Sequence, residues 1–118
     1  MVDSSLPKTV LVTGASAGIG KAFAHTFARN GFDVILVARR RDKLEEVAAD
    51  IKKTHGQLAY VLPADLGDPA APQMICDWCE QQGIEVGALV NNAGYALHTD
   101  FLDTPWEEHR AFLQVLNT

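Results

Sequence analysis

The residues best suited to chemistry form one glycine-rich stretch, TGASAGIG at positions 13–20. An apolar run precedes this stretch and a helical pattern follows it, so the sequence predicts a strand, a tight turn and a helix. In such a turn Gly14 lets the chain leave the strand, Gly18 lets the backbone approach a pyrophosphate, and Gly20 lets the helix pack against the sheet. The helix N-terminus offers free N–H groups and the positive end of a dipole to phosphates. The stretch therefore predicts a dinucleotide-binding turn.

Three consecutive arginines, Arg39, Arg40 and Arg41, indicate which dinucleotide binds. They follow a second apolar run, about 20 residues past the glycines, where an NAD-selective site places a carboxylate for the ribose 2′-hydroxyl. Ala38 stands there instead, and guanidinium groups suit a dianionic 2′-phosphate. We predict NADP rather than NAD, with Arg39 as the leading contact and the Ser16 hydroxyl as a further donor. The alternative is a solvated basic turn that opens a helix.

The cysteines and histidines make a weaker case for chemistry. Cys76 and Cys79 form one C-x-x-C pair, which could be a redox pair or half of a zinc site. The surrounding pattern is helical and no second pair follows, so we interpret both as structural cysteines. The histidines are scattered along the sequence without ligand spacing, and we expect no metal site.

Alternating elements must position the glycine turn and the arginines. Four near-continuous apolar runs predict strands covered on both faces: TVLVT at 9–13, VILVA at 34–38, LAYVL at 58–62 and VGALV at 86–90. Helical spacing between the runs predicts two inward-facing sets of side chains. The first set is Ile19, Ala22, Phe23, Thr26 and Phe27, and the second is Leu44, Val47, Ala48 and Ile51.

Capping residues mark the helix ends. Gly31 closes the first helix, where a left-handed residue favours glycine. Asp68-Pro69 predicts the start of a third helix, which ends at Gly83 and faces Ile75, Trp78 and Cys79 inward. Thr104-Pro105 with Glu107 predicts a fourth helix. The order βαβαβαβα predicts an α/β, Rossmann-type doubly wound parallel sheet with strands in the order 3-2-1-4.

Composition limits the partners. Ten Lys and Arg against fifteen Asp and Glu give a net charge of -5, which disfavours nucleic acid. No apolar run reaches the roughly 18 residues that cross a bilayer, and the N-terminus lacks the pattern of a signal peptide, so we expect a cytoplasmic protein with no membrane partner. We expect residues 1–118 to be a single dinucleotide-binding Rossmann domain, truncated at its C-terminal end. The fourth strand would then be an unpaired apolar edge, and the isolated chain would be poorly stable or a homo-oligomer.

The spacing T-G-x-x-x-G-x-G, joined by three later stretches, resembles the short-chain dehydrogenase/reductase family from Lys8 onward. Those stretches are Ala64-Asp65-Leu66, Asn91-Asn92-Ala93-Gly94 and an asparagine in the following helix. The resemblance implies that Asp65 contacts the adenine and that the N-N-A-G turn lies under the ribose. Taken alone, these residues would be read as ordinary turn residues. The expected cofactor-binding residues are Gly14, Ser16, Ala17, Gly18, Ile19, Gly20, Arg39, Arg40, Asp65, Leu66, Asn91, Ala93 and Gly94.

The resemblance also implies hydride transfer between NADP(H) and a small-molecule carbonyl or secondary alcohol, using a tyrosine, a lysine four residues later, a serine and an asparagine. Neither Tyr60 nor Tyr95 has that lysine. Asn117 is the candidate relay asparagine, one position later than the family pattern, so either a one-residue insertion compensates or Asn117 has another role. Three functions stay open: part of an NADP-dependent oxidoreductase, a non-catalytic dinucleotide-binding module, or an inactive truncated product.

Overall fold

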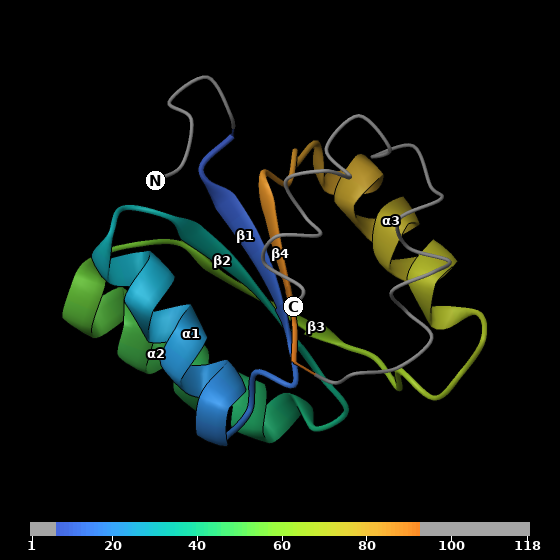
Figure 1. Ribbon diagram of the computed structural model, residues 1–118, viewed down its shortest axis with the longest axis horizontal. Coiled ribbons are helices and arrows are strands. Elements are labelled where there is room, and N and C mark those ends of the chain that lie inside the picture. The colour runs from blue at the N-terminus through green and yellow to red at the C-terminus, as the bar shows by residue number, and fades with distance from the viewer. Residues whose placement is uncertain (1–6, 93–118) are drawn as a thin grey trace.

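A computed structural model describes residues 7–92 and shows a parallel four-stranded sheet between two layers of helices (Figure 1). The elements are β1 (Thr9–Thr13), α1 (Gly18–Arg29), β2 (Asp33–Ala38), α2 (Arg41–His55), β3 (Ala59–Pro63), α3 (Ala71–Gln82) and β4 (Ala88–Asn91). The strand order is β3-β2-β1-β4, and every pairing is parallel. The predicted fold class and strand order are therefore confirmed. The fourth helix predicted from Thr104 lies outside the described residues.

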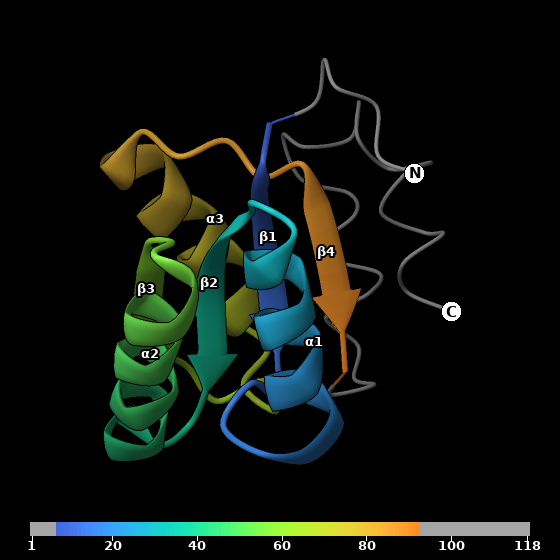
Figure 2. The ribbon, with the colours of Figure 1, turned by 90° about the vertical axis from the view of Figure 1, so that its left-hand side faces the viewer.

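Helices cover opposite faces of the sheet because the chain reverses direction across it. The path β1 to β2 to β3 moves toward one edge and places α1 and α2 on one face, whereas the return to β4 places α3 on the other (Figure 2). Strand side chains alternate between the two faces. Val10 and Val12 pack with the α1 and α2 side, and Leu11 packs with the α3 side. The carboxyl ends of β1, β2 and β3 thus share one edge of the sheet.

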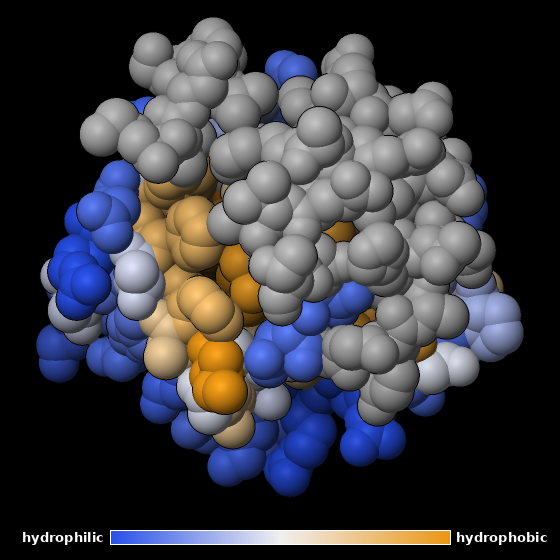
Figure 3. All heavy atoms as spheres, in the orientation of Figure 1, coloured by the Kyte–Doolittle hydropathy of each residue, from blue (hydrophilic) through white to orange (hydrophobic). Residues whose placement is uncertain are grey.

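The predicted inward face of α1 was wrong by about one residue. Gly20, Ala24 and Ala28 are buried, whereas Ile19 is 67% exposed and Phe23 is 42% exposed. Figure 3 shows apolar surface over α1 beside hydrophilic surface. The reason is steric: Gly20, which has no side chain, packs against the Gly14 backbone in the turn after β1, and the small residues Ala24 and Ala28, one and two turns later, continue that face. In contrast, all four residues predicted to be buried in α2 are buried.

Helix and strand ends differ from the predictions by a few residues. β3 and β4 begin one and two residues later than the apolar runs, as is common at element ends. Asp68 does not cap α3: its Oδ1 accepts a hydrogen bond from the Ala70 N–H at 2.9 Å, and this turn delays the helix to Ala71. Pro72 then occupies the first helical turn. Gly83 ends α3 in the left-handed conformation, as predicted.

The helices are short and serve to cover the sheet. α2, with 15 residues, is the longest in the part of the chain that the structure describes. No helix within residues 7–92 has the length and apolar character needed to cross a bilayer. Cys76 and Cys79 lie on the buried face of α3 and form no disulfide with each other. Burial, with a smaller effect of the Cys76 thiol, raises the pKa of Cys79 to about 12, which agrees with a structural interpretation.

Candidate functional site

The turn between β1 and α1 requires glycine for two different reasons. Gly14 and Gly18 have φ values of +63° and +59°, in the left-handed region that L side chains rarely adopt. Gly20 has ordinary backbone angles, but a Cβ there would lie 2.1 Å from the Gly14 carbonyl oxygen. A Cβ at position 14 would lie 2.9 Å from Asn92 Nδ2. The turn is therefore packed backbone against backbone at position 20, whereas at position 14 the Asn92 side chain occupies the space that a Cβ would need.

The N-terminus of α1 is open for an anion. Ala17 precedes the helix and provides no side-chain cap, and the first turn carries no acidic residue. Ala17, Gly18 and Ile19 are exposed. The backbone N–H groups of the first turn and the positive end of the helix dipole are therefore available to a phosphate. Ile19 is exposed because it lies at this open N-terminus of α1.

Polar side chains hold the end of β4 against the glycine turn. The buried Thr13 hydroxyl lies 3.1 Å from Asn91 Oδ1 and 3.4 Å from the Val90 carbonyl oxygen. Thr13 and Asn91 are also partners in the β1–β4 register. The amide of Asn92 lies close to where side chains at Gly14 and Gly20 would begin. Asn91 and Asn92 thus hold the end of β4 against the end of β1 and the glycine turn.

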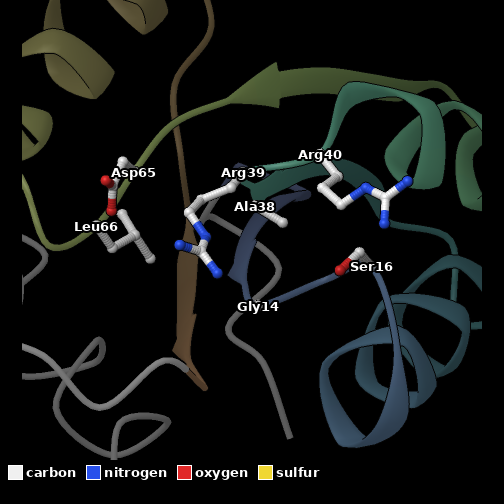
Figure 4. Close-up of a pocket in the computed structure, with 7 residues that line it drawn as sticks. All are labelled: Gly14, Ser16, Ala38, Arg39, Arg40, Asp65 and Leu66. Carbon is white, nitrogen blue, oxygen red and sulfur yellow. The ribbon is translucent and has the colours of Figure 1, made fainter.

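A cleft of about 380 Å³ lies at the carboxyl ends of β1, β2 and β3 (Figure 4). Its lining comes from the β1–α1 turn, the end of β2 and the segment after β3. The lining residues are Gly14, Ser16, Ala38, Arg39, Arg40, Asp65 and Leu66. Six of these residues were expected from the sequence to bind the cofactor, and the structure brings them together. In open α/β sheets, ligands bind in the crevice outside the carboxyl ends of the strands.

The two arginines of the cleft point in different directions. Figure 4 shows the Arg39 guanidinium over the middle of the cleft, toward Leu66 and Gly14, and the Arg40 guanidinium on the side of Ser16. Arg40 Nε donates to Asp42 Oδ1 at 3.3 Å, and Nη2 donates to Oδ2 at 2.9 Å. The hydrogen bonds from Arg40 lower the pKa of the Asp42 carboxyl below its usual value. Both side chains of this pair are mostly exposed.

Asp65 and Leu66 form the opposite wall. The Asp65 carboxylate is exposed, and its Oδ1 accepts a hydrogen bond from the Gly67 N–H at 2.9 Å. This bond makes Asp65 a turn residue as well as a lining residue. Leu66 is 9% exposed and belongs to the core beneath α3. A flat apolar group inserted here would meet an aliphatic side chain on one side and the Arg39 side chain on the other.

The remaining predicted site residues lie in or beyond the glycine turn. Ala17 lines a second cleft of about 530 Å³, which shares Ser16 and Arg40 with the first. Asn91 lies in β4, while Ala93, Gly94 and Asn117 lie outside the described residues. Sequence reasoning placed Ala38 at the end of the second strand, missed Lys43 as a lining residue, and did not count Asn92 among the binding residues. The position of Asn92 could have been found from the strand register, because it follows the partner of Thr13.

Two histidines that are far apart in the sequence meet between α1 and α2. His25 Nδ1 lies 3.1 Å from His55 Nε2, and His25 Nε2 lies 3.3 Å from Asp50 Oδ2. These contacts join α1 and α2, and Asp50 also lines the second cleft. Within residues 7–92 no group of three or more His, Cys, Asp or Glu side chains has the arrangement to hold a metal ion.

Known proteins are similar to this chain in sequence and in structure. The short chain dehydrogenase family model matches residues 8–117. A 7beta-hydroxysteroid dehydrogenase of Collinsella aerofaciens is 34% identical over 105 residues, which cover 89% of this chain and 39% of that protein. A very-long-chain 3-oxoacyl-CoA reductase-B of Danio rerio is 39% identical over 107 residues, with coverages of 89% and 34%.

Solved structures agree with these relatives. A short-chain dehydrogenase from Sphingobium yanoikuyae in complex with NADPH has a TM-score of 0.67 at 43% identity, covering 77% of this chain and 35% of that one. L-sorbose reductase from Gluconobacter frateurii, complexed with NADPH and L-sorbose, has a TM-score of 0.71 at 33% identity, with coverages of 76% and 34%. The chain spans about a third to two fifths of the length of these proteins. The glycine turn, the sheet order and the family match agree with one another. The chain therefore belongs to the short-chain dehydrogenase/reductase family of oxidoreductases, which bind a nicotinamide dinucleotide.

Proposed function

We propose that this chain is the nucleotide-binding part of an NADP(H)-dependent oxidoreductase. The observation that carries the proposal is the cleft in which Ser16, Arg39 and Arg40 meet at a strand end that bears Ala38 instead of a carboxylate. The fit of a dinucleotide rests on the glycine turn, whose closely packed backbone and uncapped helix leave space and N–H groups for a pyrophosphate. Bound NADPH would supply the hydride.

Charge favours NADP over NAD in this cleft. Arg40 and the Ser16 hydroxyl lie on one side and provide donors for a 2′-phosphate, whereas Arg39 lies over the place between Gly14 and Leu66 where an adenine would fit. The one carboxylate in the lining, Asp65, stands on the opposite wall. Charge-assisted hydrogen bonds to a dianion outweigh those to a neutral hydroxyl. We therefore propose that Ser16 and Arg40 donate to the 2′-phosphate and that the positive charge of Arg39, in the same cleft, adds to the preference for NADP.

A titration of the 118-residue protein with NADPH and NADH, followed by cofactor fluorescence, tests this proposal. We expect NADPH to bind at least about tenfold more tightly than NADH, which corresponds to about 1.4 kcal/mol. Arg39→Gln combined with Arg40→Gln should remove most of that preference. Arg29→Gln removes one charge at the far end of α1 and should leave the preference unchanged. Equal affinities for the two dinucleotides, or no binding of either, would contradict the proposal.

The reaction is proposed for the whole protein, because this chain spans only about a third of its relatives. We propose hydride transfer between the nicotinamide and a carbonyl or secondary alcohol on a small molecule. Residues 1–118 contain no Tyr-x-x-x-Lys pair, so we expect the 118-residue chain to bind NADPH without turning over ketones. A non-catalytic dinucleotide-binding module of 118 residues would give the same result, binding NADPH without turnover. Turnover by a longer form that continues into a serine and Tyr-x-x-x-Lys would separate the two.

The cytoplasm is the compartment we propose, since both cysteines are buried thiols and not disulfide-bonded. Homo-oligomer formation also stays a prediction. Among the described residues, β4 pairs with β1 alone. A fractionation experiment and sedimentation of the purified chain would test these two predictions separately.

A further inference from the structure

Arg40 is already paired, but in a way that leaves its phosphate-binding edge accessible. The Asp42 carboxylate accepts from Nε at 3.3 Å and from Nη2 at 2.9 Å, so it occupies one side of the guanidinium plane. A guanidinium has five N–H donors in a fixed fork. The pair with Asp42 uses two of these donors, one on Nε and one on Nη2. The three remaining donors, two on Nη1 and one on Nη2, lie at the end of the guanidinium. That end can bind two oxygens of a phosphate while Asp42 stays in place.

The place of the pair gives it influence over the proposed 2′-phosphate site. Asp42 lies in the first turn of α2, two residues after Arg40, while Arg40 and Ser16 line both clefts. The second cleft also carries Lys21 and Lys43, with Glu46 and Asp50 farther along α2. Among Asp42, Glu46 and Asp50, it is Asp42 that pairs with the guanidinium of Arg40. A phosphate held by Arg40 and Ser16 would therefore lie within a few ångströms of a fixed negative charge.

Two effects of Asp42 oppose each other. The carboxylate orients Arg40, which reduces the conformational entropy lost when a phosphate binds. Its negative charge also offsets the charge of Arg40 and repels a dianion, and this effect is only partly screened at such short range. An asparagine at this position would remove the charge and keep one oxygen acceptor for Arg40, so that one of the two hydrogen bonds remains. The substitution Asp42→Asn therefore removes the repulsion while part of the orienting contact stays.

We propose that Asp42 sets the strength of NADP selection in this protein, holding Arg40 beside Ser16 while lowering the affinity of the site for a 2′-phosphate. This inference rests on the proposed NADP site. It makes Asp42 a positioning and specificity-determining residue, and it predicts that the natural sequence does not have the highest NADP preference that the cleft allows.

The test uses 2′,5′-ADP and 5′-AMP, which differ only in the 2′-phosphate, titrated into the 118-residue protein by calorimetry. We expect Asp42→Asn to tighten 2′,5′-ADP binding about fivefold, or about 1 kcal/mol, and to change 5′-AMP binding less than about twofold. Glu45→Gln is the matched control, because it removes the same charge one turn later on α2, from a carboxylate that faces Arg41 at 3.8 Å. This control should change neither affinity by more than about twofold.

A second background tests whether the effect acts through Arg40. In Arg40→Gln protein, the gain from Asp42→Asn should fall below about twofold, because the phosphate is no longer held next to Asp42 and neither the offset nor the short-range repulsion acts on it. An unchanged or weaker affinity for 2′,5′-ADP in Asp42→Asn, or an equal gain in Glu45→Gln, would overturn the inference while the NADP site stands. If the unmodified protein does not prefer 2′,5′-ADP over 5′-AMP, the proposed function itself fails and this inference with it.

Discussion

The turn after β1 and the turn after β2 reach the same cleft, yet they are built in different ways. The first, between Gly14 and Gly20, is shaped by backbone that packs against backbone, and side chains at its two ends would collide with Gly14 or Asn92. The second, between Ala38 and Arg41, carries three exposed arginines, of which Arg40 pairs with Asp42 and Arg41 with Glu45. Close packing tolerates little change, whereas exposed charges contribute little to stability.

This difference separates two properties of the site. Whether the cleft can accept a dinucleotide depends on the steric fit of the β1–α1 turn, which also contributes to the stability of the domain. Which dinucleotide it prefers depends on the charges of the β2–α2 turn, which can change without unfolding anything. Variants in the first turn should therefore alter stability and binding together, and variants in the second should alter binding alone.

The largest effect is expected for Gly20→Ala. Its Cβ would lie 2.1 Å from the Gly14 carbonyl oxygen, so α1 or the turn must move. We expect the free energy of unfolding to fall by about 3 kcal/mol and NADPH binding to be lost. Chemical denaturation and a binding titration measure the two effects. Gly83→Ala is the control, because it adds the same methyl group in open space at a left-handed position, for about 1 kcal/mol and no loss of binding. Equal destabilisation by the two variants would refute the steric argument.

Gly14→Ala should have the next largest effect. The residue has a φ of +63°, and the new Cβ would lie 2.9 Å from Asn92 Nδ2, which belongs to a side chain that can move. We expect a loss of about 1 to 2 kcal/mol in unfolding free energy. Adding Asn92→Ala should recover the steric part of that loss and leave the part due to the backbone angle. A full recovery in denaturation experiments would show that the left-handed angle carries no strain.

Arg40→Gln tests the second turn and should separate binding from stability. The side chain is 67% exposed, so the unfolding free energy should change by less than about 0.5 kcal/mol. NADPH affinity should fall about tenfold, with NADH affinity nearly unchanged, because one charge-assisted contact is lost. Parallel titrations with both dinucleotides measure this. A matching loss of NADH affinity would mean that Arg40 serves the shared part of the cofactor.

The buried cysteines supply the smallest test, remote from both turns. In the folded protein the pKa of Cys79 is raised to about 12, whereas in the unfolded chain it is about 9. Between these two pH values the folded protein keeps the thiol proton and the unfolded chain loses it. The unfolded state then binds fewer protons, so stability should decline as pH rises from about 9 toward 12. At neutral pH, thiol labelling should require unfolding and should accelerate in Gly20→Ala but not in Arg40→Gln. Rapid labelling of the native protein would show that α3 opens locally.

Much of this arrangement could be predicted from local sequence. The strand order follows from four apolar runs separated by helical patterns, because right-handed crossovers leave few ways to join them. The conformations of Gly14, Gly31 and Gly83 follow from their places at turns and helix ends. Predictions from local patterns were wrong where contacts with residues distant in the sequence, or a competing local turn, determine the structure. The face of α1 is set by its contact with the β1 turn and not by its largest apolar residues, and Asp68 prefers a local turn to a helix cap.

The sequence by itself determined the parallel sheet and the glycine turn, since both arise from interactions between residues close along the chain or from rules of chain connection. It also brought Ser16, Arg39, Arg40 and Asp65 to one edge of the sheet. Only the tertiary structure decided how their side chains divide that edge, with Arg39 over the middle of the cleft and Arg40 beside Ser16. The contact of His25 with His55 was likewise settled by helix packing. The physical reason is that long side chains have many rotamers of similar energy, and their choice depends on partners that periodicity does not reveal.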